Sequence, residues 1–157
     1  MPQTYSDDRL TSYCFEELEV GMRAEYRRVI SREDVAQFAE VSGDVNPLHL
    51  DPEFAGRTMF EGTIVHGMYG AGMISAVIGT RLPGPGCVYM SQSLRFLAPV
   101  RAGDEMVASA TVVELFPEKH RTRLETQCHV GETKVISGEA LILVPTREEL
   151  AAISAAG

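Results

Sequence analysis

The chain has too little positive charge for several classes of partner. Its 14 Lys and Arg residues are outnumbered by 22 Asp and Glu residues, which gives a formal net charge of −8. Binding to nucleic acid requires a basic stripe or patch. An anionic membrane surface likewise attracts basic rather than acidic segments. The composition therefore predicts neither a nucleic-acid partner nor a membrane partner.

Cysteines are also few, and none forms a CxxC pair. Cys14, Cys87 and Cys128 are an odd and widely spaced set, which is typical of free thiols in a reducing compartment. The four histidines show no HExxH-type spacing, so we expect no metal site. These features predict a cytoplasmic protein.

Targeting and membrane-spanning signals are absent as well. The first residues, "MPQTYSDDRL", are polar and acidic, without the basic and apolar regions of a signal peptide. The most apolar run, 63–80, is interrupted by glycines, His66 and Ser75, which argues against a membrane span. There is no internal repeat, low-complexity segment or linker. With 157 residues, of which 45% are hydrophobic, we expect one domain over 1–157, with peripheral tails at 1–15 and 146–157.

The first half of the chain is predicted to carry short helices. A strand over 23–31 leads into a helix, because Ser31 and Asp34 match a capping box. Gly43 lies where that helix should stop, and Asp51-Pro52 should open another short turn or helix. The segment between them, "SGDVNPLHLD", is predicted to be a loop that is neither helix nor strand.

The second half reads as a buried helix followed by sheet. The run 63–80 is apolar on nearly every side, so its helix must be buried all round. Strands are expected at 87–100, 104–116, 120–130 and 133–145, and a capping box predicts a last helix at 146–156. Because the connections are short, we expect consecutive strands to be antiparallel neighbours. A sheet wrapped around one helix is an α+β hot-dog fold.

The loop contains the first candidate site. Asp44, Asn46 and His49 lie within six positions, in a segment stiffened by Pro47. Asp and Asn also favour ordinary turns, so a purely structural role is open for each of them. The functional interpretation is general acid–base chemistry, in which Asp44 and His49 share one water and Asn46 orients them.

The start of the buried helix offers a second candidate. N–H groups in a first helical turn lack partners within the helix and carry its positive dipole. Gly67 would let a ligand oxygen approach its N–H, as an oxyanion site requires; close packing is the alternative. Ser75 is expected on the same flank of the helix as Gly67. Its hydroxyl could contact the substrate, or it could donate a hydrogen bond to a backbone carbonyl of its own helix. His66 is expected to be structural and to hold the helix start.

These residues carry a resemblance to a known family. "FAEVSGDVNPLHLDPEFA" (38–55) resembles the hydratase-2 motif of the MaoC-like dehydratases. "IVHGM" (64–68) and "YMSQSLRFLAPVRAGDE" (89–105) are similar to segments of the (R)-specific enoyl-CoA hydratases of the PhaJ type. The similarity covers roughly residues 18–145.

The resemblance implies a fold, a site and a reaction. The fold is a hot dog with an overhanging segment that carries the catalytic loop. The catalytic pair would be Asp44 and His49, with Gly67 as oxyanion donor, Ser75 lining the site and Asn46 in support. The reaction would be reversible syn hydration of short to medium linear trans-2-enoyl-CoA to (R)-3-hydroxyacyl-CoA, for polyhydroxyalkanoate or fatty-acid metabolism. The enzyme would be a homodimeric hydro-lyase with no metal or other cofactor, coenzyme A being part of the substrate.

Other functions remain open at this point. A hot-dog thioesterase would hydrolyse acyl-CoA, but the intact spacing of Asp44, Asn46 and His49 argues against it. A non-catalytic module that binds acyl-CoA would need a tunnel for the acyl chain but not the acid–base pair, so the presence of both Asp44 and His49 argues against it. Within the family, dehydration of branched or dicarboxylic acyl-CoA is a further alternative.

Overall fold

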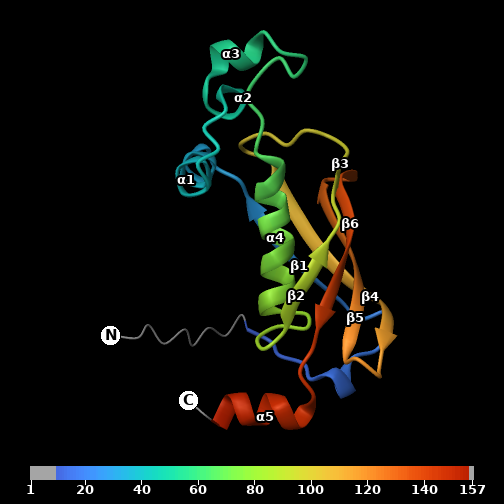
Figure 1. Ribbon diagram of the computed structural model, residues 1–157. Coiled ribbons are helices and arrows are strands. Elements are labelled where there is room, and N and C mark those ends of the chain that lie inside the picture. Colours follow the sequence, from blue (N-terminus) through green and yellow to red (C-terminus); the bar gives the residue numbers. More distant parts are fainter. Residues whose placement is uncertain (1–9, 156–157) are drawn as a thin grey trace.

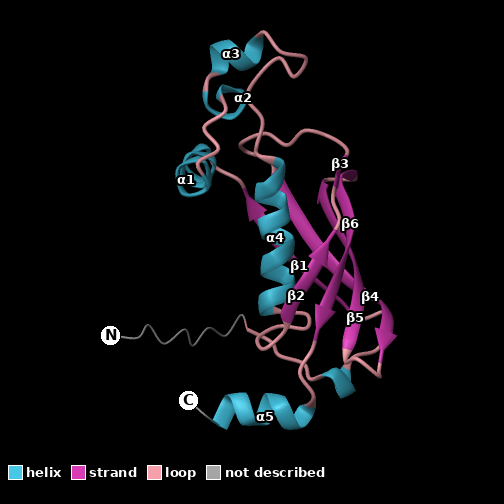
Figure 2. Cartoon of the chain, in the orientation of Figure 1, coloured by secondary structure: helices cyan, strands magenta, loops and turns pink. Residues whose placement is uncertain are grey.

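A computed structural model describes residues 10–155, and its centre is an antiparallel sheet (Figure 2). The strands run in the order β1-β4-β5-β6-β2, and β3 pairs with β6 beside β2. Their bounds are β1 Arg23–Val29, β2 Val88–Gln92, β3 Arg95–Phe96, β4 Glu105–Phe116, β5 Arg121–Val130 and β6 Thr133–Leu143.

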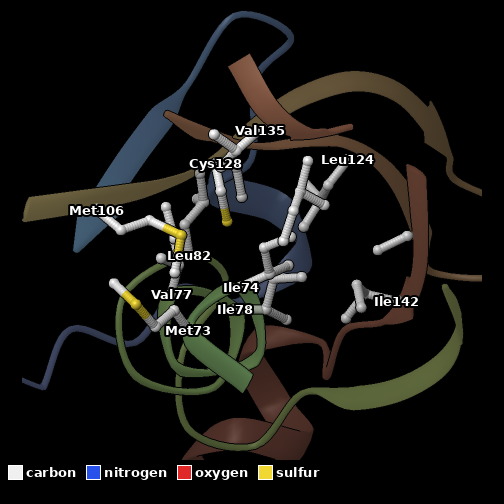
Figure 3. Close-up of a cluster of buried hydrophobic side chains, with 14 of the residues drawn as sticks. Met73, Ile74, Val77, Ile78, Leu82, Met106, Leu124, Cys128, Val135 and Ile142 are labelled. Carbon is white, nitrogen blue, oxygen red and sulfur yellow. The ribbon is translucent and has the colours of Figure 1, made fainter. Parts of the chain in front are cut away.

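One long helix, α4 (Gly67–Thr80), packs along this sheet (Figure 1). Its side chains meet those of the strands in a single apolar core (Figure 3). The fully or almost fully buried residues of the helix are Gly70, Met73, Ile74, Val77 and Ile78. The antiparallel sheet packed on α4 confirms the predicted α+β hot-dog fold. The expectation that this helix is buried all round was wrong, because the sheet covers only one side of it: Met68 is 56% exposed, and Gly72, Ser75 and Gly79 are exposed as well.

The face of the sheet that packs on α4 follows from the alternation in β5. Thr122, Leu124, Thr126 and Cys128 are each 0% exposed, while the residues between them are partly or fully exposed. Alternate side chains of a strand point to opposite faces of the sheet. The buried residues of β5 therefore lie on the face that packs on the core, and the residues between them lie on the opposite face.

Two expectations about the strands were wrong. The segment 87–100 is not one strand: β2 and β3 are separate, with a register shift within β2. The connection at 101–103 also does not join sheet neighbours, because β3 pairs with β6 while β4 pairs with β1 and β5. A short connection suggested that β3 and β4 form a hairpin. Instead, the chain crosses between them from β6 to the part of the sheet next to β1.

The helix α1 (Arg32–Ser42) lies beside the start of α4, and α2 (Pro47–Leu50) and α3 (Pro52–Gly56) lie beyond that end (Figure 1). Ser31 and Asp34 form the predicted capping box of α1. Gly43 ends this helix with φ of 81°, in the left-handed region that glycine adopts at low cost. These elements form the overhanging segment that carries the predicted loop.

Both ends of the described chain pack near the other end of α4 (Figure 1). Thr11 and Tyr13 donate backbone hydrogen bonds to Thr80 and Pro83, and a short 3-10 helix follows at Phe15–Glu17. Residues 10–15 of the predicted N-terminal tail are thus part of the packed fold; its first nine residues lie outside the described range. The last helix, α5 (Arg147–Ala155), begins at the predicted capping box.

Within residues 10–155, no helix combines the length and the apolar character needed to cross a bilayer. The cysteines Cys14, Cys87 and Cys128 are all unpaired thiols, as predicted.

The contact between Asp34 and Arg28 should make stability depend on pH. Arg28 donates two hydrogen bonds to the Asp34 carboxylate, at 3.1 and 2.7 Å, and lowers the pKa of that carboxyl from 3.8 to about 2. The stabilisation is complete above pH 4 and is lost as pH falls towards 2. Because the Arg28 side chain is 45% exposed, we expect only about 1 kcal/mol from this pair.

Denaturant unfolding at pH 5 and pH 2.5 tests this expectation. As pH falls, the free energy of unfolding should decrease less in Asp34→Asn than in the wild type. Glu33→Gln is the control, because Glu33 lies in the same helical turn but does not contact Arg28, and this variant should follow the wild type. Equal pH dependence in the Asp34 variant and the wild type would contradict the assignment.

Candidate active site

The turn after α1 positions the carboxylate of Asp44. The backbone N–H of Asp44 donates to Ser42 Oγ at 3.2 Å. The N–H of Asn46 then donates to Asp44 Oδ1 at 3.3 Å, which is the pattern of an Asx turn. The Asp44 side chain is exposed, so its carboxylate is both held in place and open to a ligand.

The next residues correct the prediction of a loop without helix. Pro47–Leu50 form the single turn α2, because proline fits the first position of a helix. Asn46 is the N-cap: its side-chain oxygen accepts a hydrogen bond from Leu48 N–H at 3.0 Å. The supporting role predicted for Asn46 therefore has a structural basis, since its side chain stabilises the turn that presents His49.

His49 is half-buried and has one tautomer favoured by its surroundings. Its Nδ1 lies 2.8 Å from the backbone carbonyl oxygen of Ile64. A carbonyl only accepts, so Nδ1 carries the hydrogen and donates it. In the neutral ring, Nε2 then has a free lone pair with which to accept a hydrogen bond or a proton.

His66 joins these two residues, although the sequence predicted only a structural role at the helix start. It is the N-cap of α4 and is 2% exposed. Its Nε2 lies 2.9 Å from the backbone carbonyl oxygen of Asp44. Its ring stacks on that of His49, with centroids 3.8 Å apart and an interplanar angle of 27°.

Asp44, His49 and His66 each bring one polar side-chain atom to within 4.8 Å of the others. A carboxylate and neutral imidazoles at this separation can hold one water and exchange protons with it. The same groups are ligand types that transition metals accept. The prediction that no metal is needed therefore requires a direct test.

A cavity of about 460 Å³ opens beside this cluster and runs between α4 and the sheet. Asp44 and His66 lie at its polar end, and Gly67 and Gly70 form part of its wall. The remaining wall is mainly apolar and comprises Met59, Phe60, Ile64, Val65, Met68, Phe96, Leu97, Ala98, Pro99, Val100, Met106, Val135 and Ile136. A polar cluster at the mouth of an apolar cavity fits a ligand with a reactive head and an aliphatic chain.

The helix α4 begins at Gly67, four residues later than the start of the expected run 63–80, so Gly67 lies in its first turn as predicted. A Cβ atom at this position would lie 2.6 Å from the ring of Phe96, so glycine is also needed for close packing. The close-packing interpretation therefore applies, because Phe96 packs against Gly67, and Gly67 also forms part of the cavity wall. Its role as an oxyanion donor stays a prediction.

Ser75 does not line this cavity. It is exposed two turns further along α4, so a substrate contact by Ser75 stays a prediction that this cavity does not support. Of the small residues Gly70, Ala71 and Gly72, only Gly70 reaches the cavity. Gly70 is buried and Gly72 is exposed.

Comparison with known proteins identifies the family of this chain. A family described as "MaoC like domain" matches residues 15–137. The chain belongs to this family. It is 55% identical over 135 residues to a 3-hydroxybutyryl-CoA dehydratase of Methylorubrum extorquens, with 86% of each chain covered. It is 47% identical to an (R)-specific enoyl-CoA hydratase of Rhodospirillum rubrum, covering 90% of this chain and 99% of that one.

Among solved structures, the MaoC-like fold of this chain resembles that of the R-hydratase PhaJ1 from Pseudomonas aeruginosa. The TM-score is 0.83 at 43% identity, with 88% of this chain and 89% of that chain covered. The family and the hot-dog fold expected from the motif are therefore confirmed.

Two members of this MaoC-like site were not assigned to it from the sequence. His66 was predicted to hold the helix start, and Phe96 was assigned only to a strand. A signal for His66 was present, because it is the one ionisable residue in the apolar run 63–80 apart from Tyr69. Phe96 gave no comparable signal, since its contact with Gly67 joins segments far apart in the chain.

Proposed function

We propose that the protein is an (R)-specific enoyl-CoA hydratase, a hydro-lyase that adds water reversibly to trans-2-enoyl-CoA. The observation that carries the proposal is that Asp44 lies at the polar end of an apolar cavity, while its carboxylate lies within 4.8 Å of a ring nitrogen of His49. The similarity to relatives named enoyl-CoA hydratase and 3-hydroxybutyryl-CoA dehydratase supports it, since these names describe the two directions of one type of reaction.

The chemistry follows from the groups present. Asp44 and His49 Nε2 hold the water, with Asp44 as the base that takes its proton while the oxygen forms a bond to C3. The negative charge that develops on the thioester oxygen is stabilised by Gly67 N–H at the positive end of the α4 dipole. C2 then receives a proton from the same pair, so the substrate gains the elements of water. The step needs no metal or redox cofactor.

The test of this function is an assay of purified protein with crotonyl-CoA. Loss of the enoyl chromophore and chiral analysis should show (R)-3-hydroxybutyryl-CoA. Release of free coenzyme A, measured with a thiol reagent, would instead indicate a thioesterase. Absence of activity on any linear enoyl-CoA would redirect the proposal to branched or dicarboxylic substrates.

The catalytic pair gives the first prediction about activity. Asp44→Asn and His49→Gln should each lower kcat by about 10²-fold or more, as expected for the loss of a general acid–base group, with an unchanged thermal unfolding midpoint. Dialysis of the wild type against a chelator should leave kcat unchanged. Near-native turnover in either variant contradicts the assignment, and loss of activity after chelation, restored by a metal, contradicts the metal-free mechanism.

The cavity gives a prediction about chain length. Each buried CH₂ favours binding by about 0.8 kcal/mol until the wall is reached, after which a longer chain must displace packed side chains at about 1–3 kcal/mol. We therefore expect kcat/KM to rise from C4 and then fall sharply within the series to C12. A flat profile would place the chain on the surface instead.

Gly70 supplies a variant with a matched control. A Cβ atom at Gly70 would lie 2.3 Å from Ile136 Cδ1, so Gly70→Ala must push this flexible side chain aside and narrow the cavity. The fall in kcat/KM should move to shorter chains, with crotonyl-CoA still accepted. Gly72→Ala, in the same helix but with nothing within 4 Å of the added Cβ, should leave the profile unchanged.

We also propose that the enzyme is a homodimer of the cytoplasm. The edge strand β2 exposes Val88, Tyr89 and Met90, at 52%, 37% and 42%. An unpaired, apolar edge favours pairing with a second chain. A two-fold axis would allow the same strand to pair with itself. The free thiols support a reducing compartment.

Light scattering at micromolar concentration should give the mass of a dimer. Met90→Lys should shift this mass towards the monomer, because a charge on an apolar edge opposes association. Val29→Lys, on the opposite edge strand β1 at a residue that is also exposed, is the control and should remain dimeric. A monomeric wild type would end the proposal.

A further inference from the structure

His66 holds the backbone of the residue predicted to be the base. Its Nε2 donates to the carbonyl oxygen of Asp44 at 2.9 Å, across 22 positions of sequence. Because a carbonyl oxygen is only an acceptor, this contact requires a hydrogen on Nε2. The hydrogen bond is sheltered from solvent, since the side chain of His66 is 2% exposed.

The His66 ring is also fixed by its neighbours. His49 stacks on it with ring centroids 3.8 Å apart, and Phe38 of α1 packs against it at 4.8 Å with an interplanar angle of 55°. One buried ring thus contacts the backbone of Asp44, the ring of His49 and the helix that precedes them both. His66 therefore links the two members of the pair to each other and to the overhanging segment.

We propose that His66 is a positioning residue for the hydration, acting through its Nε2–H on the backbone of Asp44. The inference rests on the proposed function and extends it to a residue outside the acid–base pair. By holding the carbonyl of Asp44, His66 fixes the distance between the Asp44 carboxylate and His49 Nε2. That distance decides whether both groups can hold one water.

Helix capping alone does not explain a histidine at this position. The His66 side chain makes no capping hydrogen bond to α4, and Ser, Thr, Asp or Asn would cap the helix better. Its Nδ1 is buried and has no hydrogen-bond partner among the described residues. An unsatisfied buried polar atom costs stability, because the atom loses its hydrogen bond to water on folding. The favourable polar contact of the side chain is therefore the one to Asp44.

Three substitutions separate the hydrogen bond from the packing. In His66→Gln, the amide nitrogen can occupy the place of Nε2 and still donate to Asp44. In His66→Asn, the shorter side chain places its amide near the position of Nδ1, out of reach of that carbonyl. His66→Phe keeps an aromatic ring between His49 and Phe38 but removes the donor. His129→Gln, on β5 and outside the cavity lining, is the control for loss of a histidine.

We expect His66→Asn and His66→Phe to lower kcat by about 10- to 100-fold, the scale of a catalytic group misplaced by about 1 Å. KM should change much less than kcat, and His66→Gln should recover most of the turnover. Thermal unfolding gives the folded fraction, to which kcat is normalised. His129→Gln should behave like the wild type.

Other outcomes overturn the proposal. Wild-type kcat in His66→Phe would show that the ring matters only for packing. Recovery by Asn but not by Gln would move the role to Nδ1. Losses in all three variants that follow only the folded fraction would show a purely structural residue.

A substrate-independent measurement separates this inference from the proposed function. Amide hydrogen exchange in residues 43–49 should be faster in His66→Asn than in His66→Gln if the bond to Asp44 holds the turn. An inactive wild type would refute the hydratase function, whereas an active wild type with equal exchange and equal kcat in these two variants would refute the role of His66 alone.

Discussion

The apolar packing of α4 against the sheet is the constraint on which the site depends. Ile74, Val77 and Ile78 are each 0% exposed and meet strand residues in one core (Figure 3). At about 25 cal/mol for each Å² of apolar surface removed from water, such burial dominates the free energy of folding. It fixes the helix along its length, and so fixes the place of Gly67 at the wall of the cavity.

The overhanging segment is attached both by buried apolar residues, such as Val35 and Ala39 of α1, and by polar contacts to the residues that precede α4. Ile64 is bonded at both backbone groups: its N–H donates to Leu48 at 3.3 Å, and its carbonyl accepts from His49 at 2.8 Å. Val65 N–H donates to Val100 at 2.7 Å, which joins this strip to the chain leading into β4. The catalytic loop is therefore positioned on a strip of backbone that the core itself holds in place.

Local signals explain how much of the fold and of the site could be predicted from the sequence. Capping boxes and the glycine that ends α1 depend on residues near one another in the chain, and each was identified correctly. The order of strands depends on pairing between distant segments, so the short connection at 101–103 suggested a hairpin that does not form. The turn α2 was missed because Pro47 excludes a helix at interior positions, although at a first position proline favours one.

The same division applies to the site. Asp44, Asn46 and His49 form a compact motif, whose spacing and family resemblance are enough to indicate a shared role. Phe96 enters the site only through the fold, and a histidine in an apolar run is ambiguous until its partners are seen. Ser75 was placed by helical periodicity and by the family resemblance, neither of which shows where the cavity ends along α4.

The glycines of α4 show how stability and function compete within one helix. A glycine inside a helix costs about 1 kcal/mol relative to alanine, yet Gly67 and Gly70 leave no room for a Cβ beside Phe96 and Ile136. Both positions face the cavity as well as the sheet. Phe96 and Ile136 occupy the space that Cβ atoms at these positions would take, so the missing Cβ atoms let the sheet pack close to the helix. The extensive burial of the later turns of α4 offsets the weak propensity of its first turns, so the helix can begin with the residues that the site requires.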